Sequence, residues 1–402
     1  MTAPPPSPVA ATGSGPPTVF LSVGDASGDI YAADFVRELR ALHPGARFLG
    51  MGGAELEKQG VELVVNQKEM AVSGLFELLP HLPKIVGTWR RMVAALRESR
   101  PDLVVLVDSS GFNIPFARRA RRLGSPTLYY VSPQVWGWRT GRIRKLARWV
   151  NQLAVIFPFE VDVYAGSPVS VEYVGHPLVE RLALANARID RDGARQALGL
   201  PAEAKLVALL PGSRNSEMRH LLPLQLEVAR VLHARDPRIH FAMPRASSIE
   251  RETLEAGIRE AALPSLLRID VLDGHSTELL RAADAALLKP GTSTLEAALL
   301  GCPSVVAART NRLTAWLLRR LLRVDSLTMP NLIAREPIVP EFLQEEATPD
   351  AVADAVLSLL EGPARKRQLE ALAAVREALA KGGAAKRAAE LAGEMLGGSP
   401  AA

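Results

Sequence analysis

The sequence predicts an α/β protein with two domains, each built around a parallel sheet whose strands alternate with helices. Short apolar runs without polar alternation, such as LVVLV at 103–107, are typical of strands buried on both faces. Longer segments with helical spacing separate these runs. A second series of the same kind begins after a polar stretch at 188–201. Two doubly wound halves in tandem place a ligand in a cleft between them, at the carboxyl ends of the strands.

The apolar runs fix the expected elements in chain order. The first half has a strand at 18–23, a helix at 30–42, and strands at 103–108, 127–131 and 153–157. The second half has strands at 206–210, 240–243, 269–272, 285–288 and 304–307. The tail from residue 350 on is expected to be helical, with Val352, Val356, Leu359 and Leu360 on one face. The predicted boundaries are a disordered Pro-rich extension at 1–17, domains at 18–185 and 186–365, and a helical tail at 366–402.

Composition narrows the function classes. The 402 residues are 48% hydrophobic and 23% charged, enough for two separate cores. The net charge of +5 favours an anionic partner: nucleic acid, a membrane surface or a phosphorylated substrate. A single cysteine, Cys302, excludes an intramolecular disulfide and a multi-cysteine zinc site, which fits the cytoplasm. Neither a signal peptide nor a run of about 18 apolar residues is present, so any membrane contact is expected to be peripheral.

Two polar turns follow strands in the first half. Gly24 to Asp29 joins a strand to a helix, and its backbone N–H groups can face a polar ligand, while the alternative is a tight turn with Ser27 or Asp29 as the helix cap. Asp108 ends the run at 103–107, where a general base facing the cleft would stand. From position alone, a cap or loop stabiliser explains Asp108 equally well.

Two similar turns occur in the second half. Gly212, Ser213 and Arg214 end the first strand there, and a Gly-Ser turn with a guanidinium suits a diphosphate better than it suits a plain surface loop. In the other turn, Gly291, Thr292 and Ser293 can donate to phosphate, and Glu296 can accept from ribose hydroxyls. The alternative there is a capped helix with a Glu near its positive end.

Aromatic and basic segments are ambiguous from sequence. Tyr130, Trp136 and Trp138 are interpreted as lining the cleft, although large aromatics are also ordinary core residues. The segments 82–96 and 312–323 combine apolar residues at helical spacing with arginines. Burial is the usual fate of such a stripe. In both segments, a tryptophan and the arginines beside the apolar stripe favour an interfacial helix on an anionic bilayer. The prediction is firmer for 82–96, which contains Trp89.

Taken together, these segments resemble the lipid-A-disaccharide synthase family, whose members are inverting glycosyltransferases of the GT-B type with two Rossmann-like domains. The resemblance runs from about residue 19 to 349. It rests on motifs in the family's order: SVGDASGD (22–29), LVDSSGFN (106–113), VSPQVWGWR (131–139), YVGHP (173–177), LLPGSR (209–214), PGTSTLEAALLG (290–301) and MPNLIA (329–334).

The resemblance implies transfer of a diacylated glucosamine from its UDP donor to diacylglucosamine 1-phosphate (lipid X), giving a β-1,6-linked disaccharide 1-phosphate and UDP. It implies that the first domain holds the acceptor and meets the cytoplasmic face of the inner membrane, and that the second binds the UDP-sugar. No metal or cofactor is implied, because no DxD pair or ligand cluster of the kind that binds Mg²⁺ is identified in the sequence. Nucleic acid is not an expected partner, and a homo-oligomer remains open.

The resemblance also distributes roles among the residues. Asp108 would take the proton from the acceptor's 6-hydroxyl, with Asp25 as a second catalytic residue. The chain departs from the family at Asp25, usually Glu, at Gly111, usually Asp, and at Lys289-Pro290, commonly Ala-Ser. The residues implied to bind substrate are Gly24, Ser27, Gly28, Asn113, Trp136, Gly212, Ser213, Arg214, Gly291, Thr292, Ser293, Glu296, Asn331 and Gln344.

Two other functions remain consistent with the sequence. A different GT-B enzyme, such as a transferase acting on a polyprenol-linked sugar or a UDP-sugar epimerase, would share the nucleotide turns. A non-catalytic nucleotide or lipid binder would keep only the fold. His176, at the presumed hinge, is either a structural histidine or a donor in the cleft.

Overall fold

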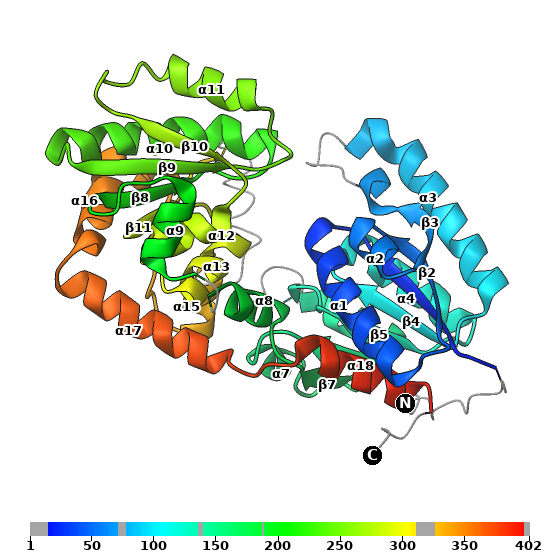
Figure 1. The fold of residues 1–402 in the computed structure, drawn as a ribbon. Helices are drawn as coiled ribbons and strands as arrows, with labels where there is room; N and C mark the ends of the chain where they lie inside the picture. Colours follow the sequence, from blue (N-terminus) through cyan, green and yellow to red (C-terminus); the bar gives the residue numbers. More distant parts are fainter. Residues whose placement is uncertain (1–14, 71–77, 136–139, 187–188, 311–325, 398–402) are drawn as a thin grey trace. The chain divides into compact units, whose positions relative to one another are not determined.

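The computed structural model describes residues 15–70, 78–135, 140–186, 189–310 and 326–397, which form two compact units (Figure 1). One unit joins the residues up to Pro177 with those from Lys381 on, and the other runs from Leu178 to Ala380. The chain thus passes from the first unit to the second after Pro177, before the boundary at 185 expected from the sequence. It returns to the first unit at Lys381, within the predicted tail at 366–402.

The first unit contains a parallel sheet with seven strands among the described residues, in the order β3-β2-β1-β4-β5-β6-β7. The strands are β1 (Thr18–Val23), β2 (Arg47–Gly52), β3 (Glu62–Asn66), β4 (Leu103–Val107), β5 (Thr127–Tyr130), β6 (Gln152–Val155) and β7 (Ser170–Tyr173). The helices are α1 (Ala26–Leu42), α2 (Ala54–Lys58), α3 (Leu78–Ser99), α4 (Ser110–Arg122), α6 (Ile143–Trp149), α7 (Glu160–Val163) and α18 (Ala384–Met395), with 3-10 turns η1 (Gln67–Met70) and η2 (Thr140–Arg142).

The second unit contains a parallel sheet with six described strands, in the order β10-β9-β8-β11-β12-β13. The strands are β8 (Lys205–Leu210), β9 (Ile239–Arg245), β10 (Ile269–Asp273), β11 (Ala285–Leu288), β12 (Ser304–Ala308) and β13 (Glu341–Leu343). The helices are α8 (Pro177–Asn186), α9 (Arg191–Leu198), α10 (Asn215–Arg235), α11 (Arg251–Glu260), α12 (Ser276–Ala282), α13 (Thr292–Leu300), α15 (Met329–Ala334), α16 (Pro349–Leu360) and α17 (Pro363–Ala378), with the 3-10 turn η3 (Gln344–Glu346).

Burial explains why the apolar runs form central strands. All five residues of β4 are fully buried, since this strand lies inside the sheet and helices cover both faces. The same holds for Val207 to Leu209 in β8. The predicted fold class, two doubly wound parallel α/β domains, is confirmed.

Both sheets reverse their strand order beside their first strand. The chain builds outward from β1 to β3 and then returns to place β4 on the other side of β1, and it does the same with β8 and β11. Ligands of such sheets bind outside the carboxyl ends of the strands at this switch point. The four polar turns selected from the sequence follow β1, β4, β8 and β11 and therefore flank the two switch points.

Helix α3 corrects one part of the membrane prediction for segment 82–96, namely that its tryptophan and apolar stripe face a bilayer. Met92 and Leu96 are fully buried, and the Trp89 ring packs edge-on against Phe112 and Phe116 at 5.2 and 5.9 Å. The tryptophan and the apolar stripe that follows it therefore belong to the core of the first unit, as periodic apolar stripes usually do. Segment 312–323 lies outside the described residues. None of the described helices has the length and apolarity to span a bilayer.

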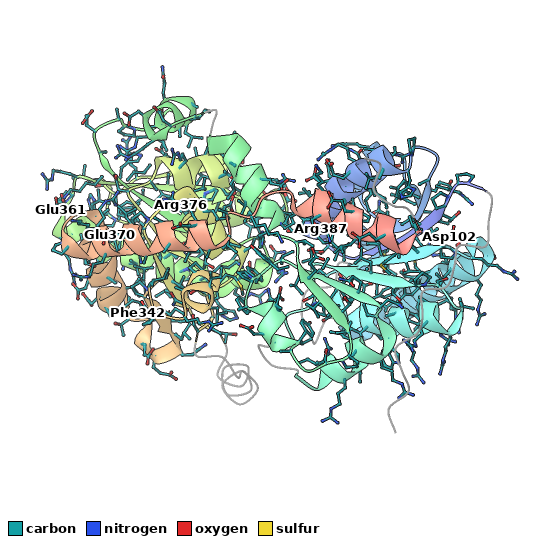
Figure 2. The ribbon with its side chains drawn as sticks, turned by 90° about the horizontal axis from the view of Figure 1, so that it is seen from below. Asp102, Phe342, Glu361, Glu370, Arg376 and Arg387 are labelled. Carbon is teal, nitrogen blue, oxygen red and sulfur yellow. The ribbon has the colours of Figure 1, made fainter. Side chains whose placement is uncertain are left out.

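The end of the chain returns to the first unit. Helix α16 buries Val352, Val356, Leu359 and Leu360 in the second unit, as the spacing predicts. After α17, helix α18 packs beside α1 (Figure 1). Alanines line its buried face, which lets the two helices approach closely: Ala384, Ala385, Ala388, Ala389 and Ala392. Arg387, labelled in Figure 2, donates from Nε and Nη2 to the two carboxylate oxygens of Glu172, at 2.6 and 3.0 Å.

Candidate active site at the two switch points

The turn after β1 carries Asp25 as the N-cap of α1. Its carboxylate accepts a hydrogen bond from the Gly28 N–H at 3.3 Å. Asp29 is buried and accepts from the N–H groups of Gly53 and Glu55 at 2.6 and 2.9 Å, so it caps α2 instead. The cap of α1 is therefore Asp25 and not Ser27 or Asp29.

The turn after β4 has an unusual backbone. Asp108 and Ser109 both adopt positive φ, 45° and 41°, a conformation that L-residues rarely occupy. A side chain on Gly24 would collide with Ser109, so the glycine allows the turns after β1 and β4 to approach each other. Strain of this kind persists only where surrounding contacts hold it.

Asn113 and Tyr129 supply those contacts. The Asn113 amide is fully buried, donates to the carbonyl oxygens of Val107 and Asp108 at 3.0 Å and of Ser22 at 3.1 Å, and accepts from the Ser22 hydroxyl at 2.6 Å. The buried Tyr129 hydroxyl also donates to the Asp108 carbonyl. Asn113 was expected to bind substrate. The described contacts of its amide all lie within the unit and tie the ends of β1 and β4 together.

Asp108 has an altered acidity. Its own surface is exposed, yet protein atoms fill much of its surroundings, and this loss of solvation raises the pKa of its carboxyl to about 6. The negative charge of Asp25 raises the pKa further, and the Ser109 N–H opposes both effects. A carboxylate with a pKa near the working pH is suited to accept a proton.

The turns after β8 and β11 meet around a carboxylate that the sequence analysis did not select. Glu217, in the first turn of α10, accepts from the Ser213 N–H at 2.9 Å and lies 3.1 Å from the Lys289 ammonium and 3.6 Å from the Arg214 guanidinium. The spacing of Glu217 behind the Gly-Ser-Arg turn was the available signal, since it matches an acidic residue closing over a helix start.

Glu296 lies one turn into α13, as expected. Its Oε1 accepts from the Thr277 hydroxyl at 2.5 Å, and burial raises the pKa of its carboxyl. Ser293 at the start of the same helix has a buried hydroxyl with no hydrogen-bond partner within the described part of the chain. Gly291 has a φ of 143°, which suits glycine alone.

Asn331 and Gln344 hold the far edge of the second sheet. The buried Asn331 amide accepts from the Val339 N–H at 2.7 Å and donates to the Val339 carbonyl at 2.9 Å and to Glu341 at 3.0 Å. The Gln344 amide pairs with both backbone groups of Thr310 at 3.1 Å when its oxygen and nitrogen are assigned to satisfy both. Both N–H groups of the Asn331 amide are used in these bonds, so donation from Asn331 to a ligand would have to replace one of them.

The remaining predicted site residues divide as follows. Tyr130 is fully buried with its ring 5.9 Å from that of Phe35, so it is a core residue and not part of an aromatic wall. His176 is buried against the Tyr31 and Phe157 rings, and burial lowers its pKa to about 3, which keeps its imidazole neutral. Trp136 and Trp138 lie outside the described residues.

Two Rossmann-like units, each with polar turns at its switch point, define a protein of the GT-B class. UDP-GlcNAc 2-epimerase from Neisseria meningitidis, solved with UDP-GlcNAc, has a TM-score of 0.64 at 14% identity and covers 94% of this chain and 99% of its own. The glycosyltransferase of kitacinnamycin has a TM-score of 0.60 at 19% identity, covering 94% and 99%. These two likenesses establish the fold alone.

Sequence comparison identifies the family. The family model described as Lipid-A-disaccharide synthetase matches residues 19–394. Lipid-A-disaccharide synthase of Myxococcus xanthus (strain DK1622) is 40% identical over 382 residues, which cover 95% of this chain and 98% of that protein. The chain belongs to the lipid-A-disaccharide synthase family and is a glycosyltransferase of lipid A biosynthesis. The resemblance stated from the motifs is thereby confirmed.

Proposed function

We propose that this chain transfers 2,3-diacylglucosamine from its UDP conjugate to 2,3-diacylglucosamine 1-phosphate, forming a β-1,6-linked disaccharide 1-phosphate and UDP. In this reaction the acceptor's 6-oxygen forms a bond to the donor's anomeric carbon while the bond from that carbon to the diphosphate breaks. The acceptor's hydroxyl proton goes to a base, and the bonding electrons leave with UDP. Attack opposite the leaving group inverts the anomeric centre.

The residues at the two switch points suit the two halves of this chemistry. In the first unit, Asp108 accepts the proton and Asp25 sets the charge around it. In the second unit, Arg214 and the N–H groups of the turns at 212–213 and 291–293 bind the diphosphate and stabilise the charge that develops on it. Glu296 accepts from the ribose. The observation that carries the proposal is the exposed Asp108 carboxylate, whose pKa of about 6 suits a general base.

Incubation of the purified protein with both lipid substrates, followed by mass analysis, tests the reaction. We expect equimolar UDP and disaccharide 1-phosphate. Asp108→Ala should lower kcat by at least about 100-fold with UDP affinity nearly unchanged, because loss of a general base affects the chemical step. The absence of both products from the wild-type reaction would refute the function, and near-normal turnover of Asp108→Ala would refute the base assignment.

We also propose that the protein works as a peripheral protein at the cytoplasmic face of the inner membrane, where nucleotide sugars meet acylated acceptors. The exposed side of α3 offers Lys84, Arg90 and Val86, whose side chain is 44% exposed. Flotation with anionic vesicles should show binding that falls as salt rises. Lys84→Gln with Arg90→Gln should weaken it, and the same charge change at Lys366 and Arg367 on α17 is the control. Equal binding of both double variants would exclude α3 as the contact.

A further inference from the structure

The turns after β8 and β11 form a compact charged cluster made of Ser213, Arg214, Glu217 and Lys289. The turns are neighbours because β8 and β11 pair directly, with Leu210 beside Leu288. The Lys289 ammonium and the Arg214 guanidinium both approach Oε1 of Glu217, while the Ser213 N–H donates to its Oε2.

The donors around Glu217 are those that a diphosphate would use. An ammonium, a guanidinium and a loop N–H at the start of a helix together favour a group with several anionic oxygens. In the structure, the Glu217 carboxylate is the anion that these three donors contact. Helix capping explains its bond to the Ser213 N–H, but capping does not require the lysine that approaches from another strand.

Lys289 is the member of the cluster whose position most needs an explanation, because its charged side chain is largely buried. Its side chain is 19% exposed and that of Glu217 is 17% exposed, whereas Arg214 is 65% exposed. Withdrawing a lysine from water is unfavourable unless an anion compensates for the lost hydration. The unpartnered Ser293 hydroxyl at the start of α13, two residues after Gly291 in the same turn, adds a donor that no described group uses.

We propose that Lys289 binds the diphosphate of the nucleotide and that Glu217 holds this place in the free protein until the diphosphate displaces it. The inference rests on the proposed binding of a UDP-sugar by the second unit. The exchange replaces one set of ion pairs by another, so Lys289 and Arg214 are never left without a counter-anion. The returning carboxylate also competes with bound UDP and favours its release.

Calorimetry of the full chain with UDP, inorganic pyrophosphate and uridine tests the role of Lys289. Lys289→Met should weaken UDP and pyrophosphate by about 10- to 100-fold, as expected for loss of a charged hydrogen bond, and leave uridine unchanged. The control is Lys205→Met, which removes an equal charge at the opposite end of β8, where Lys205 pairs with Glu361. Unchanged UDP affinity in Lys289→Met would overturn the assignment.

Glu217→Gln tests the displacement. Removing the competing anion should tighten UDP and pyrophosphate by about 3- to 10-fold, while Glu361→Gln should change neither. If Glu217→Gln unfolds, Lys289→Met with Glu217→Gln removes both charges and should bind UDP more tightly than Lys289→Met alone. Equal or weaker binding would overturn the displacement. A wild-type protein that binds no UDP would instead refute the proposed function itself.

Discussion

At Asp108, backbone conformation and side-chain chemistry are linked. The positive φ of this residue requires the carbonyl contacts from Asn113 and Tyr129, and both contacting groups are buried beneath the turn. These two residues touch no substrate in the proposed reaction. We therefore assign them as positioning residues for the carboxylate.

Tyr129→Phe tests this assignment, since it removes one of the two bonds to the Asp108 carbonyl and little volume. We expect kcat to fall about 10-fold with KM nearly unchanged, in line with a contact that positions the base for the chemical step. Tyr173→Phe, which removes another buried tyrosine hydroxyl of the first unit, should leave kcat unchanged. An equal effect of both variants would point to general destabilisation.

The Asp25 charge gives a prediction on pH. Asp108 must be ionised to accept a proton, so the acid limb of kcat/KM should lie near pH 6. Asp25→Asn removes the like charge that raises the pKa of Asp108, although burial remains the larger cause. The acid limb of kcat/KM should therefore move to lower pH in Asp25→Asn, because Asp108 then stays ionised at lower pH than in the wild type. Profiles of kcat/KM from pH 4.5 to 8 measure the shift, with Asp34→Asn, a partly exposed carboxylate on α1, as control.

Sequence motifs located the turns but not every residue that acts in them. Asp108, Arg214 and Glu296 stand where strand ends and helix starts predict. Glu217 was missed because its importance comes from a lysine that is 72 positions later in the chain (289 − 217) and is brought close only by strand pairing. The commitment of Asn113 and Asn331 to buried amide contacts was equally invisible, since a motif gives residue type and not orientation.

Among the elements, α9 packs on the second unit with a buried arginine, Arg195, beside the buried Ala194. Arg195 donates to the carbonyl oxygens of Ala282, Pro201, Ala202 and Ala204 and to the Asp284 carboxylate at 2.9 Å. Asp284 also accepts from the Leu206 N–H at 2.8 Å at the start of β8. Arg195 in α9 thereby contacts the end of α12 at Ala282, the loop before β8, and Asp284 before β11.

Arg195→Met should lower the free energy of unfolding of the second unit by about 3 kcal/mol, because it removes a buried cation that donates to several carbonyl oxygens and to the Asp284 carboxylate. Arg191→Met is a matched control, since Arg191 pairs with the same Asp284 but is 45% exposed. That change should cost less than about 1 kcal/mol. Denaturant unfolding compares the two, and equal losses would show that burial of Arg195 adds nothing.

The elements also show what apolar patterning can predict. Central strands such as β4 and β8 were predicted within one or two residues, because burial on both faces leaves a continuous apolar run. The edge strands β3, β7 and β13 were not predicted. They are short and only partly buried, so polar residues interrupt them. Glycines at two of its six positions concealed β2, which is a buried strand.

At the scale of the whole molecule, α18 completes the first unit from the far end of the chain. Ending the chain at Ala380 should expose the surface of α1 that α18 covers and destabilise the first unit, with the second unit retaining its unfolding midpoint. Hydrogen exchange followed separately in α1 and α10 measures this. Arg387→Met, which removes partly exposed ion pairs with Glu172, Glu390 and Glu394 but leaves the helix in place, should cost less than the truncation. Unchanged exchange in α1 after the truncation would contradict the role of α18.

The position of α18 also sets an order for biosynthesis. When the ribosome has made the residues up to Pro177, the first unit has its whole described sheet but lacks its last helix. The second unit must then be synthesised, which takes on the order of 10 to 40 s at bacterial elongation rates. During that time α1 presents a bare surface in the nascent chain. The second unit has all its residues earlier, so the domain translated first is the one that matures last.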